Sequence, residues 1–364
     1  MRVVCDGLTL ADAVLKVSKA LPQKITNPIL EGIKLTAKDD VLTLFATEMN
    51  FSIEKNINAE VLEEGEVVVP GRLFTEFTRK LTNEQQVELL LQEGKVIIRY
   101  TDSQSTLQCF DIKEYPIFHQ LESVKKFFIE EEEFKDIINK VIFSASTDDS
   151  RPILKGVLLE INECLTAVAL DSYRMAICKK PLAQKADKIS AIVPARNLAE
   201  IAKLLEEGSG IVSVSVDDKT LFVDIGHTKI STSLLSGEYI NYKQVLPTSF
   251  QTTLNANREQ FANALERANI ISRGEKKNLV KFEIKENILV LTAESELGSI
   301  KESVSIRLWG KDLNINFNAK YISDCLRAIQ NEFIKIQFNT SVSPCIITPG
   351  ETDECTYFIL PIRI

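Results

Sequence analysis

Few residues of this 364-residue chain have the types and spacing that catalysis requires. Asp148 and Asp149 form the best carboxylate pair for acid–base work, and a hydrolase that uses them is one hypothesis. Adjacent acids in a loop are more typical of turns, and no nucleophile or base accompanies them in the sequence. The two histidines, His119 and His227, fit no triad, and phosphate-binding and nucleophile-elbow motifs are absent. We therefore expect a protein that binds or organises and is not an enzyme.

The seven cysteines are scattered along the chain without a C-x-x-C spacing. Such a dispersed set is typical of reduced, mostly buried thiols. With only two histidines the chain has little material for a zinc site, so we expect no metal and no cofactor. Asp6 stands where the apolar core of a signal peptide would begin, and no apolar run approaches the ~20 residues that cross a bilayer. These features predict a cytoplasmic protein with no membrane partner.

Basic residues are the other group that could have a function, here the binding of a polyanion, although the formal net charge is −8. Net charge is an average, and the distribution of charge decides where a polyanion could bind. Lysines and arginines recur on the exposed faces of predicted helices, namely Lys16, Lys19, Arg72, Arg79, Lys80, Lys135, Lys140, Arg196, Lys203, Arg267, Lys320 and Arg327. Acidic residues interleave with them, so solvated faces with salt bridges are the alternative interpretation.

These helices belong to a pattern that repeats about every 124 residues. Pro28-Ile29-Leu30-Glu31-Gly32 recurs as Pro152-Ile153-Leu154-Lys155-Gly156, and Val69-Pro70-Gly71-Arg72 recurs as Val193-Pro194-Ala195-Arg196. A fixed period indicates a duplicated unit, and this one has the commonest size of a domain. We predict three similar domains, at residues 1–121, 122–247 and 248–364.

Each copy contains a helix, several strands, a second helix and further strands. Apolar residues at helical spacing predict helices over residues 8–21, 72–81, 133–143, 196–205, 258–272 and 320–329. Alternating apolar and polar runs, such as residues 41–46, 96–100 and 211–216, predict strands between them. Strand outweighs helix, so the predicted fold class is α+β, with two helices packed on antiparallel sheets in each domain.

Three such units with basic helix faces indicate part of a ring. Helices along its inner surface would turn their basic side chains toward a channel that could hold duplex DNA. Contacts to phosphates alone do not depend on sequence and permit sliding. Three domains make only an arc, and two-fold dimerisation would close it and pair the open sheet edges. A repeat-built protein-interaction scaffold without DNA is the alternative.

The chain resembles the bacterial sliding clamp family, the beta subunit of DNA polymerase III, over its whole length. The motifs that carry the resemblance are Asn27 to Leu30, Val69 to Arg72, Ser150 to Gly156, Ala169 to Ala176 and Leu360 to Ile364. The resemblance implies a homodimeric ring of six similar domains, of which one chain forms half. Such a ring encircles double-stranded DNA, tethers the replicative polymerase for processive DNA replication and is opened by a clamp loader. It implies a non-catalytic subunit of the nucleotidyltransferase holoenzyme.

The resemblance also implies DNA-binding residues, which fall on Lys24, Arg72, Asp148, Arg151, Pro152 and Ile153. Lys24 stands where the family has arginine, which keeps the charge but loses the bidentate fork. The best-known members carry a glutamine and two tyrosines in the loop of residues 148–153. Arg151 is therefore the stronger candidate for a DNA contact in that loop.

A second implied site is a peptide pocket between the second and third domains. It would receive short linear motifs that end in apolar residues, from polymerases, the clamp loader and repair proteins. The residues that map to it are Leu154, Leu170, Ser172, Arg174, Met175, Ile240, Val245, Leu246, Tyr321, Pro344, Leu360, Pro361, Ile362 and Arg363.

The apolar members of this set could instead fill an inter-domain core. Arg363 favours the pocket, because an unpaired charge inside a core would be costly. Ile240 replaces a proline of the family and Gln244 an arginine, so we expect the rim to prefer somewhat different peptides.

Overall fold

All six predicted helices are present in the computed structural model. It describes every residue except 25–26, 119–124, 185, 207, 209, 274–276, 351, 353 and 364, so the predicted boundary at 121/122 lies outside the described residues. The helices are α1 (Gly7–Val17), α2 (Gly71–Thr78), α3 (Glu131–Ile142), α4 (Ala195–Ala202), α5 (Arg258–Ser272) and α6 (Ala319–Ala328). No described helix is both long and apolar enough to span a membrane.

Local sequence explains where these helices begin. Asp6 caps α1 by accepting a hydrogen bond from the Thr9 amide at 2.7 Å. Asn257 and Asn318 cap α5 and α6 in the same way. Pro70 ends a strand directly before α2, where its missing N–H costs nothing.

The strands follow the same order in each copy, with one additional strand, β5, in the first. In the first copy they are β1 (Arg2–Cys5), β2 (Gly32–Lys38), β3 (Val41–Thr47), β4 (Phe51–Asn58), β5 (Glu60–Glu63), β6 (Gly65–Pro70), β7 (Val87–Gln92), β8 (Lys95–Tyr100) and β9 (Ser103–Gln108). In the second they are β10 (Lys125–Glu130), β11 (Gly156–Ile161), β12 (Cys164–Leu170), β13 (Arg174–Pro181), β14 (Ile189–Pro194), β15 (Ile211–Val216), β16 (Thr220–Ile225) and β17 (Thr228–Ser233). In the third they are β18 (Thr252–Asn257), β19 (Leu279–Lys285), β20 (Ile288–Ser295), β21 (Gly298–Gly310), β22 (Leu313–Asn318), β23 (Phe333–Phe338), β24 (Cys345–Pro349) and β25 (Cys355–Ile359).

All strand pairs of the described residues are antiparallel, and sheets continue from one copy into the next. The first copy contains a five-stranded sheet in the order β5-β1-β7-β8-β9. An eight-stranded sheet runs β10-β15-β16-β17-β4-β3-β2-β6, and a twelve-stranded sheet runs β14-β11-β12-β13-β25-β24-β23-β18-β21-β20-β19-β22. We call the two ladders between copies, β4·β17 and β13·β25, the seams.

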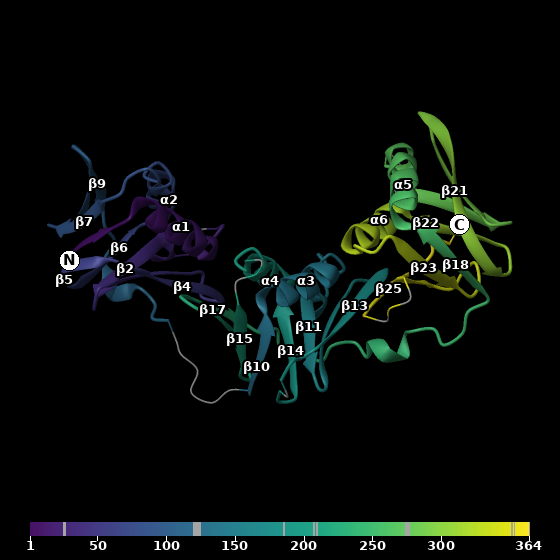
Figure 1. Cartoon of the computed structure of the whole chain (residues 1–364), viewed down its shortest axis with the longest axis horizontal. Helices are drawn as coiled ribbons and strands as arrows, with labels where there is room; N and C mark the ends of the chain where they lie inside the picture. The colour runs from purple at the N-terminus through teal and green to yellow at the C-terminus, as the bar shows by residue number, and fades with distance from the viewer. Residues whose placement is uncertain are drawn as a thin grey trace. The chain divides into compact units, whose positions relative to one another are not determined.

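The contacts divide the chain into two compact units (Figure 1). The first unit comprises residues 1–132 and 203–234, and the second comprises residues 133–202 and 235–364. The five- and eight-stranded sheets lie in the first unit, and the twelve-stranded sheet lies in the second. Because this division follows the shared sheets, it does not test the predicted three-domain boundaries.

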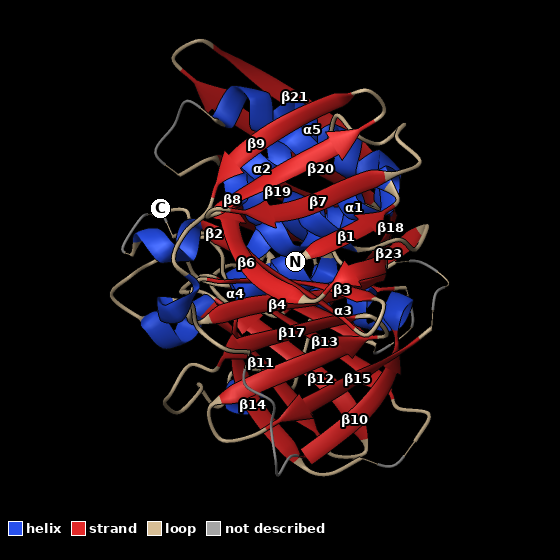
Figure 2. Cartoon of the chain, turned by 90° about the vertical axis from the view of Figure 1, so that its left-hand side faces the viewer, coloured by secondary structure: helices blue, strands red, loops and turns tan. Residues whose placement is uncertain are grey.

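Helices cover one face of the sheets, and Figure 2 views the chain from the strand side with helices behind. Helix α1 packs against β3, β4 and α2, and α5 packs against β19, β20, β21 and α6. Their apolar faces supply the core between the layers, where Leu10, Val14 and Phe261 are fully buried. The helical periodicity of the sequence therefore identified the buried faces correctly.

Two tyrosines spaced by the sequence period anchor the chain after each of the first two copies. The Tyr115 hydroxyl donates to the Gly32 carbonyl at 2.7 Å. The Tyr239 hydroxyl donates to the Gly156 carbonyl at 3.2 Å. The two donors are 124 residues apart, and so are the two acceptors. The repeat therefore preserves a long-range contact as well as local structure.

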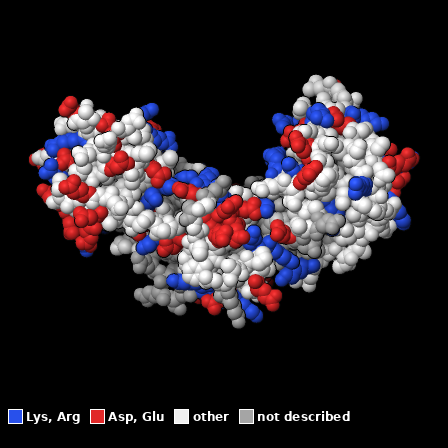
Figure 3. Space-filling view, in the orientation of Figure 1, with Lys and Arg blue, Asp and Glu red and all other residues white. Residues whose placement is uncertain are grey.

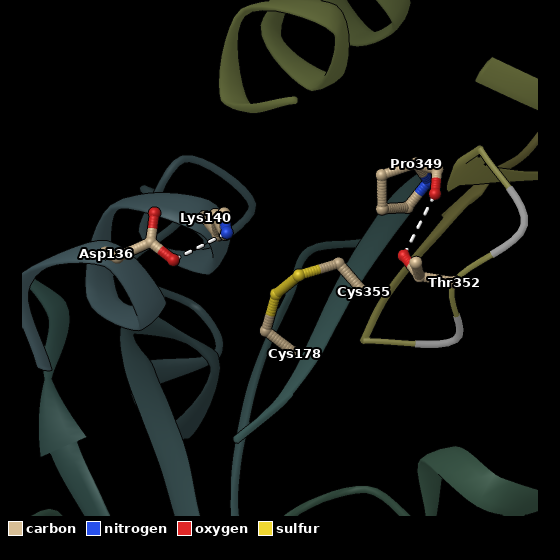
Figure 4. Close-up of a disulfide and its surroundings, with 6 residues drawn as sticks. All are labelled: Asp136, Lys140, Cys178, Pro349, Thr352 and Cys355. Atoms are coloured by element: carbon tan, nitrogen blue, oxygen red, sulfur yellow. Dashed lines mark hydrogen bonds and ion pairs between the residues drawn. A yellow bond between two sulfur atoms is a disulfide. The ribbon is translucent and has the colours of Figure 1, made fainter. Parts of the chain in front are cut away.

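The expectation of wholly reduced cysteines was wrong for one pair. Cys178 on β13 and Cys355 on β25 form a disulfide across the second seam (Figure 4). The antiparallel register places the two residues directly opposite each other, with their Cα atoms 4.2 Å apart. They are 177 residues apart in the sequence, so their spacing gave no sign of the bond. Cys5, Cys109, Cys164, Cys325 and Cys345 are free thiols, as expected.

Counting thiols tests this pairing. Alkylation of the denatured protein without reductant should modify five cysteines, and alkylation after reduction should modify all seven. The intact mass of each product gives the count. Seven modified cysteines in the unreduced sample would show that the cross-strand bond does not form.

Candidate functional site

Several of the basic helix residues predicted to face a polyanion are neutralised by acids. Lys16 bonds to Asp12 at 3.1 Å and to Glu206 at 2.7 Å. The guanidinium of Arg267 makes two bonds of 2.7 Å to the Glu302 carboxylate. Lys140 pairs with Asp136, and Arg327 pairs with Asp324. For these four helix residues the salt-bridge interpretation is correct.

Helix α2 keeps an exposed basic surface. Arg72, Arg79 and Lys80 are exposed, and among the described residues none of them has an acid within ion-pair distance. Figure 3 shows that positive and negative side chains are interspersed on the face it presents. A basic site on this chain is therefore local to particular helices and does not extend over whole faces.

The segment that contains Lys24 lies beside α2. The Arg72 Nη2 atom donates to the Pro22 carbonyl at 3.1 Å, two residues before Lys24. Lys24 is exposed. The structure thus brings together two predicted DNA-binding residues that are 48 positions apart in the sequence.

The loop of residues 148–153 leads into a 3₁₀ helix, η4 (Pro152–Lys155). The Asp148 carboxylate accepts hydrogen bonds from the Ser150 amide at 2.9 Å and the Ser150 hydroxyl at 2.7 Å. These bonds lower the pKa of Asp148, so this exposed acid is ionised at neutral pH. Arg151 and Pro152 are exposed and Ile153 is half-buried.

The same loop offers no support for a hydrolase. The Asp149 carboxylate pairs with Lys155, and Asp148 is held by Ser150. Burial raises the pKa of the Cys5 thiol to about 12 and raises that of the Cys325 thiol well above its ordinary value, so these thiols stay protonated and inert. In the described part of the chain no three His, Cys, Asp or Glu side chains are grouped to hold a metal ion.

The predicted peptide-pocket residues divide into a buried floor and an exposed rim. Leu154, Leu170 and Met175 are at most 6% exposed and belong to one apolar cluster with Tyr242 and Phe358. Their burial agrees with the alternative that such residues fill a core. Partly buried residues cover this cluster, and two of them, Leu246 and Leu360, are also predicted pocket residues.

The remaining members lie nearer the solvent. Ile240 is 42% exposed and Val245 is 47% exposed. Ser172 and Arg363 are exposed, and the half-buried members are Tyr321, Pro344, Pro361 and Ile362. Arg363 is exposed, so it places no unpaired charge inside a core.

Arg174 is the most constrained of the predicted residues. Its guanidinium bonds to Asp171 at 3.1 Å, to Asp324 at 2.7 Å and to the Phe143 carbonyl at 2.6 Å. It also lies over the ring of Tyr321, with 4.7 Å from Cζ to the ring centroid. Among these partners the sequence reasoning missed Asp171, Asp324 and Phe143 as parts of the site. Asp324 is 150 residues away in the sequence, so no local pattern could identify it.

Tyr173 is another residue that the sequence reasoning missed. It is 57% exposed and stacks on Tyr321, with ring centroids 5.9 Å apart. Its carbonyl accepts a hydrogen bond of 2.8 Å from the Leu360 amide, which fixes the start of the carboxyl-terminal run. The Ile362 amide donates to the Asn316 carbonyl at 2.7 Å. The terminal residues are therefore held in place by backbone bonds to two different segments.

Comparison with known proteins assigns the family. The chain matches the N-terminal, central and C-terminal domains described for the DNA polymerase III beta subunit, over residues 1–119, 128–241 and 243–363. It is 31% identical to a protein named beta sliding clamp from Halalkalibacterium halodurans over 379 aligned residues, covering 100% of both chains. The chain belongs to the DNA polymerase III beta subunit family.

Solved structures of beta subunits share the whole fold. The sliding clamp of Bacillus subtilis is 27% identical and covers 100% of this chain and 99% of its own, with a TM-score of 0.96. The beta subunit of Streptococcus pyogenes is also 27% identical, covering 100% of both chains, with the same TM-score. The predicted α+β fold of three clamp domains is therefore confirmed. As a beta subunit, the chain is a sliding clamp, a non-catalytic processivity factor.

Proposed function

We propose that two copies of this chain form a closed ring around duplex DNA and tether the replicative polymerase to it. The observation that carries the proposal is that the repeat leaves two strands of the seam-forming type without a partner strand in this chain. In each seam, the third hairpin strand of one copy pairs with the last strand of the next copy. The equivalent strands left over are β21 of the third copy and β9 of the first.

Both leftover strands have an open edge in the described structure. Strand β9 pairs only with β8, and residues 298–305 of β21 pair only with β20. An unpaired edge offers a row of N–H and C=O groups to another strand. Pairing β21 of one chain with β9 of a second chain would satisfy both edges, and a two-fold axis would then close the ring.

The two seams also supply the register of this contact. In the first seam Lys55 lies opposite Thr228, and in the second Cys178 lies opposite Cys355. The strand pairing inside each copy shows which residues occupy equivalent positions. By this comparison Glu302 of the third copy corresponds to Lys55 of the first and Cys178 of the second. The same comparison places Ser103 at the position of Thr228 and Cys355. We expect Glu302 of one chain to lie opposite Ser103 of the other.

A pair of introduced cysteines tests this arrangement. The variant Ser103→Cys with Glu302→Cys should form a disulfide-linked dimer, because Cys178 and Cys355 form a disulfide at the equivalent place within the chain. Non-reducing electrophoresis detects the link, and light scattering of the unmodified protein should give a two-chain mass.

The matched control is Thr106→Cys with Glu302→Cys, which puts the two cysteines out of register. It should remain uncross-linked, as should each single variant. A strictly monomeric unmodified protein would contradict the ring, and cross-linking of the control would contradict the register.

For DNA contact we propose Lys24, Arg72 and Arg151 as phosphate ligands, supported by their exposure and by the bond from Arg72 to Pro22. Pro152 and Ile153 would approach the sugar–phosphate backbone from η4. Asp148 would act by shaping the loop, since its carboxylate is occupied by Ser150 and would repel phosphate. These contacts would not depend on DNA sequence.

The salt dependence of DNA binding tests the role of Arg72. Arg72→Gln should lower the slope of log affinity against log salt by about 0.9, the effect of losing one phosphate contact. Arg267→Gln is the matched control, because Glu302 already neutralises that side chain. Fluorescence anisotropy with a short labelled duplex over a salt series measures both. Equal slopes for Arg72→Gln and the unmodified protein would remove Arg72 from the DNA site.

We further propose that the floor and rim residues of the second unit bind short peptides with apolar ends. Support comes from Ile240 and Val245, which are exposed and adjoin in sequence Tyr239 and Leu246, two residues packed against the buried apolar cluster. A sliding clamp of Pseudomonas aeruginosa has been solved bound to griselimycin, and griselimycin is the probe that we choose here. Polymerases, the clamp loader and repair proteins are the expected partners.

Removing the carboxyl-terminal run tests the peptide site. Deletion of residues 360–364 should abolish griselimycin binding in calorimetry and leave the two-chain mass unchanged, because the run contributes to the rim but not to β9 or β21. Ile288→Ala is the control, since it removes a 45% exposed apolar side chain outside this cluster and should bind normally. Normal binding by the truncated protein would contradict the assignment.

The domain boundaries at 121/122 and 247/248 and the cytoplasmic location remain part of this proposal. The matched ranges 1–119, 128–241 and 243–363 support the boundaries. If the protein were a scaffold that does not bind DNA, the salt dependence measured with the labelled duplex would be the same for every charge variant. The Arg72 experiment therefore also distinguishes the clamp from the scaffold.

A further inference from the structure

Arg174 is directed at the interior of its own unit. Three of its N–H groups donate to Asp171, Asp324 and the Phe143 carbonyl, and its plane lies over two aromatic rings. The side chain is 10% exposed. A guanidinium has five N–H donors in a fixed fork, so a geometry that uses three of them leaves little freedom to turn toward a ligand.

We propose that Arg174 and Asp324 act as one positioning unit. On this proposal, peptide affinity depends on the pair as a brace between α6 and the start of β13, and not on contact between Arg174 and the peptide. The proposal rests on the peptide site proposed above. It assigns a role to Asp324, which is not among the residues that map to the pocket.

The brace connects three separate segments. Phe143 follows the last turn of α3, Asp171 lies in the turn between β12 and β13, and Asp324 lies in the middle of α6. Removing one partner breaks the ion pair that joins α6 to the start of β13 and leaves each charge only a partner on its own side, Asp171 or Arg327, so the segments are expected to shift. The Arg174 side chain is 10% exposed and that of Asp324 is 13% exposed, so water screens their ion pair only weakly.

A shift of α6 would reach the rim directly. Tyr321 lies one turn before Asp324 on α6, and Arg174 contacts both side chains. Tyr321 stacks on Tyr173, whose carbonyl holds the Leu360 amide at 2.8 Å. The brace thus sets the positions of Tyr321 and of the carboxyl-terminal run through a short chain of contacts.

Charged groups around the pair do not substitute for it. Asp171 bonds to the guanidinium through Nε, and Arg327 bonds to the other oxygen of Asp324 at 3.2 Å. The Arg327 side chain is 64% exposed, so its bond is screened by water. Arg327 is therefore a suitable control, because it contacts the same carboxylate without bracing the two segments.

The experiment compares the conservative variants Arg174→Lys and Asp324→Asn, their double variant and Arg327→Gln. Griselimycin affinity is measured by calorimetry at a temperature at which circular dichroism shows every variant folded. Each single brace variant should weaken binding about tenfold, and the double variant should be no weaker than the worse single, because the two residues act as a unit. Arg327→Gln should bind within about twofold of the unmodified chain.

A direct contact between Arg174 and the ligand gives a different result. Releasing the guanidinium with Asp324→Asn would then leave affinity unchanged or raise it, while Arg174→Lys alone would lower it. That pattern would overturn the proposal, and so would additive losses in the double variant. A loss with Arg327→Gln as large as that with Asp324→Asn would also overturn it.

Amide hydrogen exchange tests the brace without a ligand. Exchange at the Leu360 amide should accelerate in both brace variants and stay unchanged in Arg327→Gln, because that amide bonds to Tyr173. Unchanged exchange in the brace variants would defeat the positioning role. Failure of the unmodified protein to bind griselimycin would instead defeat the proposed peptide site, so the two failures are distinguishable.

Discussion

The pairing of sheet edges between successive copies is the constraint on which this fold depends. Each copy forms hairpin sheets whose outer strands would otherwise expose unpaired backbone groups. The seams β4·β17 and β13·β25 satisfy those edges within the chain. Because the copies share sheets, the compact units do not coincide with the repeats. The strands of the first and third copies that correspond to the seam strands are β9 and β21, and the proposed contact with a second chain would pair them.

Equivalent places along the seams carry different chemistry. In the first seam Lys55 donates to the Thr228 hydroxyl at 3.2 Å, and in the second Cys178 and Cys355 are covalently linked. The first contact is reversible, whereas the second constrains a loop of 177 residues and opposes separation of its strands even in a partly unfolded chain. Glu302 occupies the matching place on β21, where it is bonded to Arg267. In the proposed ring this joint would have to open to admit DNA, which non-covalent pairing allows.

Features fixed by local sequence were predictable, and features fixed by distant contacts were not. Apolar spacing located all six helices, and the 124-residue period gave the repeated succession of helices and strands, although it missed the strands β1, β10 and β18 that precede the first helix of each copy. The availability of the basic helix residues was overestimated, because acids such as Glu206 approach Lys16 from 190 positions away. The disulfide and the pair of Arg174 with Asp324 are equally non-local. For the candidate site, sequence reasoning selected residues that share one buried apolar cluster, but it could not pair Arg174 with Asp324 across 150 positions.

The repeat also explains why partner-binding residues are expected in one copy only. At the first seam Phe118 stacks edge-on against Phe45 and Phe222, and this aromatic group closes the surface beside Tyr115. Ladder pairing places Val168 and Ile346 at the positions of Phe45 and Phe222 in the second seam. The residue that matches Phe118 there is Tyr242, whose hydroxyl donates to Glu160. The proposed peptide site uses the second seam, which lacks the three-phenylalanine group of the first and near which Ile240 and Val245 are exposed.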